Sequence, residues 1–217
     1  MISLMHLWNH WVIGDIHGCA DALSALLRCL PAKDRLIFCG DVINRGPQIE
    51  RAMQLAWTQV MNGRAVWLMG NHEQRFVQQL SVPLADSEPP SDCMLQLGQQ
   101  RCLVWANRLK SLPVVHWGDG WVATHAGFDP CSWQPDVNIR LPFWQAYDGR
   151  FGEVIVGHTP GAEVRRINKV VLIDTGARFG GKLSAYCPET GDIRSVPGLD
   201  PRRRNSQFAL TPATTSA

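Results

Sequence analysis

Features that mark several classes of protein are missing from this chain of 217 residues. Its seven cysteines are an odd number and form no C-x-x-C pair, which argues against a disulfide framework or a structural zinc cluster and favours a reducing cytoplasm. The formal net charge is only +2, so the total charge gives no electrostatic case for binding nucleic acid or a membrane. No apolar run approaches the ~20 residues that a membrane-spanning helix needs.

The two ends of the chain show little pattern. Residues Met1 to Trp11 have neither the cationic start nor the long apolar core of a secretion signal, so we expect a cytoplasmic protein. No repeat or linker interrupts the sequence, and residues 1–196 are therefore expected to form a single domain. Residues 197–217 lack hydrophobic periodicity, and we expect them to be a disordered tail.

Short apolar runs alternate with helical patterns in the first half of the chain. Runs at 11–13, 36–39 and 65–69 predict strands, and each is followed by apolar residues at helical spacing. Such strand–loop–helix units predict parallel strands joined by right-handed crossovers. In sheets of this kind, functional residues lie at the carboxyl ends of the strands.

The second half is mostly β in pattern. It predicts a helix at 99–110, a hairpin from 114–116 to 121–125, strands at 154–156, 170–173 and 183–186, and a final hairpin through 189–192. The proline- and serine-rich residues 82–92 are expected to form a surface loop. Both halves together predict an α/β fold with one two-layered core.

Polar residues that can bind metals follow the predicted strands. They are Asp15, His17, Asp41, Asn71, His72, His125 and His158. Any one of them alone is typical of a cap or a turn, but seven in the same topological position indicate a shared site. Oxygen and imidazole donors together suit Mn, Fe or Zn rather than a metal that prefers thiolates.

Three sequence blocks carry a resemblance to a known family. They are Gly14 to Gly18 (GDIHG), Gly40 to Gly46 (GDVINRG) and Gly70 to Glu73 (GNHE). The chain resembles the PPP family of calcineurin-like metallophosphatases, whose blocks are GDxHG, GDxVDRG and GNHE. Later markers match from Thr124 to Gly127, Gly157 to Pro160 and Ile173 to Ala177, so that the resemblance runs from about Trp11 to Val196. It implies a two-layered mixed β-sandwich flanked by helices, as in the small bacterial and phage protein phosphatases.

The resemblance also implies a pair of metal ions. Asp15 and His17 would hold one ion, Asp41 would bridge the two, and the other ion would be held by Asn71, His125 and His158. Two divalent ions ~3.5–4 Å apart can activate a shared water and clamp phosphoryl oxygens during in-line displacement. We expect Mn, with Fe or Zn as alternatives.

Further site residues follow from the same blocks. Arg45 is expected to bind phosphate oxygens, and the family's second phosphate-binding arginine is expected to be Arg140, with Arg150 as the rival. His72 would protonate the leaving oxygen. The family aspartate that pairs with this histidine is replaced by Asn44, so we predict a lower pKa for His72 and weaker acid catalysis on alkyl phosphates.

The remaining histidines, His6, His10 and His116, lie outside the blocks and are expected to be structural or surface residues. Loops 82–92 and 128–147 are expected to select the substrate.

These residues support more than one function. The first expectation is a phosphatase in which a metal-bridging hydroxide attacks phosphomonoesters, above all phosphoserine, phosphothreonine or phosphotyrosine in proteins, with small phosphate esters as other partners. The alternative is a symmetrical dinucleoside tetraphosphate hydrolase. This alternative is favoured by the stretch from Asn44 to Pro47 and by the fact that anhydride cleavage needs no general acid. It is opposed by the short chain and by Glu73, since this position is often aspartate in that branch of the family. A binding scaffold without catalysis is the third reading, which the complete set of ligands opposes.

Overall fold

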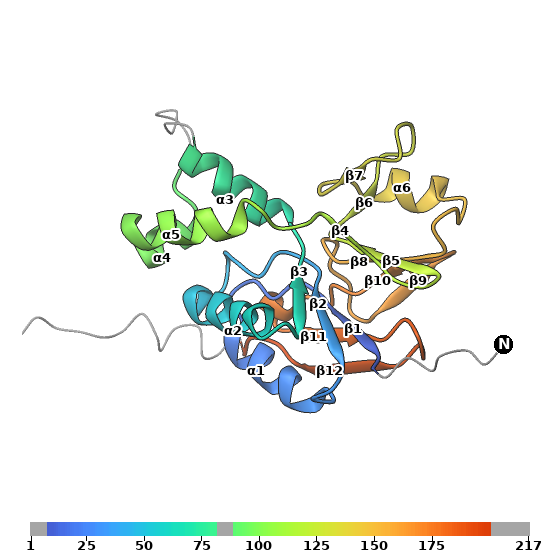
Figure 1. Ribbon diagram of the computed structural model, residues 1–217, viewed down its shortest axis with the longest axis horizontal. Helices are drawn as coiled ribbons and strands as arrows, with labels where there is room; N and C mark the ends of the chain where they lie inside the picture. The colour runs from blue at the N-terminus through green and yellow to red at the C-terminus, as the bar shows by residue number, and fades with distance from the viewer. Residues whose placement is uncertain (1–7, 82–88, 201–217) are drawn as a thin grey trace, which may run out of the picture.

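Two five-stranded β-sheets lie face to face in the computed structural model, which describes residues 8–81 and 89–200 (Figure 1). The first sheet has the order β12-β11-β1-β2-β3. Its strands are β1 (His10–Ile13), β2 (Arg35–Phe38), β3 (Ala65–Trp67), β11 (Lys182–Tyr186) and β12 (Ile193–Pro197). The second sheet has the order β4-β5-β8-β10-β9. Its strands are β4 (Val115–Trp117), β5 (Trp121–Thr124), β8 (Glu153–Val156), β9 (Arg165–Ile167) and β10 (Val170–Leu172).

The first sheet is built from the three predicted strand–helix units. Strands β1, β2 and β3 are parallel, with Val12 opposite Ile37 and Ile37 opposite Val66. The connecting helices are α1 (Ala20–Cys29), α2 (Ile49–Met61) and, after β3, α3 (Asn71–Ser81). The predicted hairpin of β11 and β12 adds two antiparallel strands next to β1. The parallel arrangement predicted from the sequence is therefore confirmed.

The second sheet also contains three parallel strands. Strands β5, β8 and β10 are parallel in the centre, and β4 and β9 are antiparallel at the edges. The β4–β5 pair is the hairpin predicted around Gly118 to Gly120. Each sheet therefore presents three parallel strands whose carboxyl ends lie at one edge.

Apolar side chains fill the space between the sheets and cover both outer faces. Val12 and Ile37 from the first sheet meet Ile155 and Val171 from the second, and all are at most 2% exposed. Helices α1 and α2 cover the outer face of the first sheet, and α6 (Leu141–Ala146) covers that of the second (Figure 1). The molecule is thus the predicted two-layered mixed β-sandwich flanked by helices.

The sequence reasoning missed several short elements. They are α4 (Asp92–Leu97), β6 (Gly127–Phe128), β7 (Pro135–Asp136), α6, which lies within the expected loop 128–147, β9 and a 3-10 turn η1 (Ala177–Phe179). The predicted helix at 99–110 is α5 (Gln99–Leu109). Residues 82–88 of the predicted loop lie outside the described residues. Helix α4 does carry a local signal, because the Ser91 side chain accepts from the Met94 N–H as an N-cap.

The predicted start of the disordered tail is wrong. Pro197 still belongs to β12, and the Leu199 N–H donates to the Ala177 carbonyl at 2.7 Å. Leu199 also packs against the core under α1, which explains its order. Residues 201–217 lie outside the described residues.

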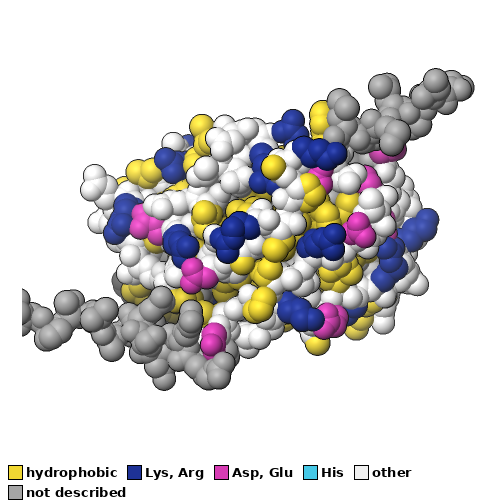
Figure 2. All heavy atoms as spheres, turned by 90° about the horizontal axis from the view of Figure 1, so that it is seen from below, with side chains coloured by type: hydrophobic (Ala, Val, Ile, Leu, Met, Phe, Trp, Pro, Cys, Tyr) yellow, Lys and Arg dark blue, Asp and Glu magenta, His cyan; other side chains and the backbone are white. Residues whose placement is uncertain are grey.

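The described surface has mixed charge. On the face shown in Figure 2, Lys and Arg side chains are dispersed, with Asp and Glu beside several of them. Within residues 8–81 and 89–200, no helix combines the length and apolarity needed to cross a bilayer.

Candidate metal centre

Each of the six parallel strands leads into a polar residue at the same edge of the sandwich. After β1, β2, β3, β5, β8 and β10 come Asp15, Asp41, Asn71, His125, His158 and Asp174. Apart from Asn71, all are at most 8% exposed. The topology thus brings together every metal ligand that the resemblance implied, and it adds Asp174, for which the sequence reasoning gave no role.

Asp41 lies between two groups of side chains. Its Oδ1 is 3.5 Å from Nε2 of His125, whereas its Oδ2 is 3.7 Å from Nε2 of His17. Oδ2 of Asp15 lies 3.8 Å from the same His17 nitrogen. The two oxygens of Asp41 therefore face different histidines, as a carboxylate shared between two cations would.

His125 and His158 each have one ring nitrogen whose lone pair faces another hydrogen-bond acceptor. Nδ1 of His125 donates to the Cys39 carbonyl at 2.8 Å, and Nε2 of His158 donates to the Asn138 carbonyl at 3.2 Å. The other two ring nitrogens, 3.2 Å apart, are then acceptors facing each other.

Asn71 completes this arrangement. Its Oδ1 lies 3.0 Å from the His125 nitrogen and 3.1 Å from the His158 nitrogen. Donors held at ~2.0–2.2 Å from one cation lie about this far apart. Three acceptors that face one another repel unless a cation lies between them, so the donor set fits a metal ion.

Acceptors also face one another in the second group, which contains Asp15, His17 and Asp41. Nδ1 of His17 donates to the Ile43 carbonyl at 3.1 Å, which leaves its Nε2 lone pair facing the carboxylates of Asp15 and Asp41. An imidazole acceptor against two carboxylates is stable only with a cation or a proton among them.

Burial keeps the histidines neutral and opposes the charge on the carboxyl groups. Burial lowers the pKa of His17 and of His158 to about 3, and that of His125 to about 4. It raises the pKa of Asp41 to about 7, with repulsion from Asp174 adding to the effect. Neutral imidazole is the form that binds metal, and a divalent cation would offset the cost of ionising buried carboxyl groups.

The backbone at this edge is strained. His17, Asp41 and His158 have φ values of 46°, 50° and 63°, in the left-handed region that such residues rarely adopt. The N–H groups of Ile16 and His17 both donate to the Asp41 carbonyl, which joins the loops after β1 and β2. Unusual backbone at several positions of one cluster is typical of functional sites.

Two glycines allow the loops to approach this closely. A Cβ on Gly70 would lie 2.3 Å from Oδ1 of Asp41, and one on Gly157 would lie 2.1 Å from Oδ1 of Asp15. Any larger residue would displace a candidate ligand, which explains why glycine precedes Asn71 and His158.

Glu73 supports the loop that carries Asp41. Its carboxylate is fully buried and accepts N–H groups from Asp41, Val42, Ile43 and Gly70 at 2.8–3.3 Å. Burial, followed by the Asp41 charge, raises the pKa of Glu73 to about 8, while these N–H groups oppose the shift. The last residue of the third block thus holds the backbone of the candidate shared ligand.

Comparison with known proteins identifies the family. Residues 10–162 match the model of the calcineurin-like phosphoesterases. The chain belongs to this family. Its members use divalent metal ions, in agreement with the donor set.

The relatives cover nearly the whole phosphoesterase. The asymmetrical bis(5'-nucleosyl)-tetraphosphatase PrpE of Bacillus cereus (strain Q1) is 28% identical over 88% of this chain and 94% of its own length. A solved structure described provisionally as a diadenosine tetraphosphatase has a TM-score of 0.68 and 23% identity, over 90% of this chain and 96% of that one. A protein serine/threonine phosphatase from Saccharomyces cerevisiae has a TM-score of 0.61 and 14% identity, over 89% of this chain and 81% of that one. Both structures support the fold.

Arginines line the pocket beside the candidate metal centre of the phosphoesterase. Arg45 and Arg140 both border this cavity of about 200 Å³, together with His17, Asp41 and His158. The rival, Arg150, pairs with Asp148 at 2.8 Å and lies over the ring of Trp133, and it does not line the cavity. The geometry therefore favours Arg140 over Arg150.

Other lining residues were missed from the sequence. They are Pro160, Asp174, Arg178 and Phe179. Asp174 follows a predicted strand, as the other candidates do, so the same topological signal was available for it. Arg178 and Phe179 lie on the turn η1, which no periodicity predicts.

His72 has an unusual partner. The Asn44 side-chain oxygen accepts from the Cys93 N–H at 2.9 Å, so that the amide nitrogen faces Nδ1 of His72 at 3.1 Å. Nδ1 is then the acceptor, and the neutral ring carries its proton on Nε2. Burial and then the Arg45 charge lower the pKa of His72 to about 4. Asn44 is not among the causes of this shift, so the lower pKa expected relative to family members with aspartate stays a prediction.

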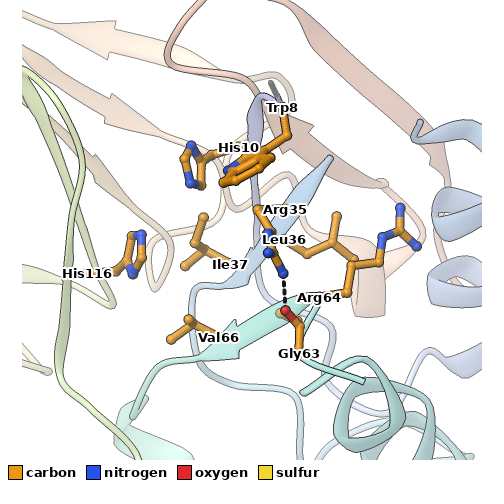
Figure 3. A pocket seen from close by; sticks show the side chains of 10 residues that line it. Trp8, His10, Arg35, Leu36, Ile37, Gly63, Arg64, Val66 and His116 are labelled. Atoms are coloured by element: carbon orange, nitrogen blue, oxygen red, sulfur yellow. Dashed lines mark hydrogen bonds between the residues drawn. The ribbon is translucent and has the colours of Figure 1, made fainter. Parts of the chain in front are cut away.

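A second pocket of about 340 Å³ lies at the opposite ends of the strands, near the start of β1 and β2 (Figure 3). Its arginines are used internally, because Arg35 donates to the Gly63 carbonyl and Arg64 to the Pro31 and Asp34 carbonyls. His10 and His116 border this pocket and not the metal centre. His6 lies outside the described residues.

Proposed function

We propose that this phosphoesterase hydrolyses a phosphoanhydride bond of dinucleoside tetraphosphates at a centre of two divalent cations. Asp15 and His17 would hold one cation, and Asn71, His125 and His158 the other, with Asp41 between them. Relatives that match almost end to end carry dinucleoside tetraphosphatase names, which supports this substrate class. The first expectation, a protein phosphatase, is supported only by a likeness of fold at 14% identity.

The contact between Asn44 and His72 carries the proposal. A serine or threonine leaving oxygen needs a proton, which a histidine can supply only when it is readily protonated. Here the Asn44 amide faces Nδ1, and the imidazolium form would place one N–H against another. A nucleotide leaves an anhydride as a stabilised phosphate anion, so the reaction does not require this acid.

The chain's other groups bind and orient the substrate. When bound, the cations supply an activated water and positive charge on the phosphoryl oxygens. The guanidinium forks of Arg45 and Arg140 face the same cavity and can each take two phosphoryl oxygens. Neutral histidines keep the loaded centre positive, which favours a polyanionic substrate. Oxygen and imidazole ligands make Mn the first choice of metal, with Fe or Zn as alternatives.

The position of the cut separates two versions of this function. Symmetrical cleavage, the alternative expected from the sequence, gives two ADP from diadenosine tetraphosphate. The curated relatives are named asymmetrical, and that cut gives ATP and AMP. We propose the asymmetrical cut on the strength of these relatives.

The test compares substrates on the same purified chain with Mn²⁺. Diadenosine tetraphosphate and a phosphoserine peptide are supplied at equal concentration, and nucleotide products are separated by chromatography. We expect faster turnover of the dinucleotide, formation of ATP and AMP, and loss of turnover with a chelator. Faster release of phosphate from the peptide would overturn the proposal in favour of the second candidate, hydrolysis of phosphoserine, phosphothreonine or phosphotyrosine. Two ADP as the products would overturn the asymmetrical cut.

A further inference from the structure

An exposed aromatic ring borders the catalytic cavity. Phe179 lines the same cavity as Asp41 and Arg140, yet 63% of its surface is exposed. A phenylalanine normally buries most of its surface, and the phosphoesterase buries Phe38, Phe76 and Phe143 completely. Its exposure at the rim of the cavity leaves the ring open to contact with a ligand bound there.

The turn that carries Phe179 is held by backbone hydrogen bonds. Gly176 and Gly180 flank η1 in the left-handed conformation, with φ values of 71° and 91°. The Phe179 N–H donates to the Gly176 carbonyl at 2.9 Å, and the Ala177 carbonyl accepts from the Leu199 N–H at 2.7 Å. Ala177 is buried, so the turn is anchored on the core, whereas Arg178 is half-buried and Phe179 is exposed. A ring on such a support loses little entropy when it binds a ligand.

Arg178 places a positive charge beside this ring. Its guanidinium carbon lies 4.1 Å from the centre of the Phe179 ring. Arg178 also lines the same cavity as His17 and Asp41, which places it beside the candidate metal centre. A π-face and a cation next to a phosphate-binding cavity are the groups that recognise a nucleotide, because bases stack on rings and arginines bind phosphates.

We propose that Arg178 and Phe179 form the subsite for one nucleoside end of the substrate. The base stacks on the Phe179 ring, and Arg178 binds the phosphate chain on its way to the metal centre. This inference rests on the proposed function, since only a nucleotide substrate carries the base. It makes Phe179 the residue that distinguishes nucleotides from phosphate esters of the same charge.

The test isolates the base with two inhibitors that differ only in it. AMP and ribose 5-phosphate share the ribose and the phosphate, and each is used to inhibit hydrolysis of p-nitrophenyl phosphate by the Mn²⁺-loaded full chain. The ratio of the two inhibition constants measures what the base contributes. Phe179→Leu keeps apolar bulk without the π-face, and Phe179→Trp keeps a π-face. Trp117→Leu is the control, because Trp117 is similarly exposed, at 57%, and does not line the cavity.

We expect the wild-type preference for AMP to fall at least about fivefold in Phe179→Leu, the lower end of the range for stacking on one base. It should persist in Phe179→Trp and in the Trp117→Leu control. Thermal melts check folding, and Phe179→Gln serves as a second variant if Phe179→Leu melts early. A ratio that stays within twofold of wild type in Phe179→Leu, or falls equally in the control, would overturn the subsite.

The two proposals can fail separately. If wild type cleaves diadenosine tetraphosphate and the ratio of inhibition constants is the same in Phe179→Leu as in wild type, the proposed function stands and the subsite falls. If wild type leaves the dinucleotide intact while Phe179→Leu lowers the ratio, the proposed function falls and the nucleotide subsite stands.

Discussion

The side chain of Asn44 donates to Nδ1 of His72, 3.1 Å away, because its oxygen is already occupied by the Cys93 N–H. Helix α4 supplies that N–H, and its Asp92 carboxylate also accepts from the Arg45 N–H at 2.9 Å. A short helix absent from the sequence-based prediction thus fixes which group Asn44 offers to His72. Because the offered group is a donor, it favours the neutral imidazole.

Restoring a carboxylate should restore acid catalysis. In Asn44→Asp, one carboxylate oxygen can keep the contact with the Cys93 N–H. The other can accept a hydrogen bond from a protonated Nδ1 of His72, which raises the pKa of His72. General acid catalysis contributes about 10²–10⁴-fold, and we expect at least about tenfold to appear in the ratio of alkyl to aryl phosphate turnover. Steady-state rates on both ester types measure it.

Asn168→Asp is the matched control, because it introduces the same charge at the turn between β9 and β10, away from the cavity. An unchanged ratio in Asn44→Asp, or an equal rise in the control, would contradict the role given to Asn44.

Removal of the shared carboxylate should affect both cations. In Asp41→Asn, an amide N–H₂ replaces one oxygen that faces the histidines, so the bridge is lost. We expect calorimetric titration with Mn²⁺ to show fewer than two ions per chain and turnover to fall at least about 100-fold, since loss of an outer-shell partner alone costs about 10–100-fold. Asp119→Asn, at the exposed β4–β5 turn, should keep both properties. Two tightly bound ions in Asp41→Asn would refute the bridge.

Glu73 should stabilise the fold through its four backbone contacts. A glutamine at this position has one acceptor oxygen, and its N–H₂ group would face backbone N–H donors. We expect Glu73→Gln to lower the free energy of unfolding by about 1–3 kcal/mol, the cost of buried donors left unpaired. Urea denaturation of the metal-free chain measures it at about pH 9, above the Glu73 pKa of about 8, where the carboxyl group is ionised. Equal stability of wild type and variant would show that these contacts are not required.

The metal-free protein should lose stability between about pH 7.5 and about pH 9. The site histidines have pKa values lowered from 6.5, and unfolded histidines still bind protons near that value, so their contribution rises with pH and is complete only at about pH 7.5. The pKa of Asp41 is raised to about 7 and that of Glu73 to about 8, so the native state binds more protons than the unfolded state in this range. Stability therefore falls as pH rises.

Divalent cations should reverse this trend, because they favour the ionised carboxylates. Urea unfolding at several pH values, with a chelator or with Mn²⁺, compares the two states. Metal-free stability that rises from about pH 7.5 to about pH 9 would contradict the assigned shifts.

The regular part of the fold and the candidate ligands could be predicted because they depend on local pattern. Apolar runs such as 11–13 and 36–39 specify strands, and a loop after a parallel strand has only one edge of the sheet to occupy. Asp15 and Asp41 were found on this basis. The division into two sheets is less local, since β11 follows β10 in the chain but pairs with β1.

The missed parts depend on tertiary contacts. Arg178 and Phe179 lie on a three-residue turn that is anchored by Leu199, which is distant in sequence. The orientation of the Asn44 amide depends on Cys93 in the same way. Neither contact has a periodic signal, so the rim of the site and the polarity at His72 appear only in three dimensions.

Anomalous diffraction from crystals soaked in Mn²⁺ tests the central claim most directly. The account predicts two peaks ~3.5–4 Å apart, with one oxygen of Asp41 on each, Asp15 and His17 at the first and Asn71, His125 and His158 at the second. A single peak, or two peaks of which only one contacts Asp41, would contradict it.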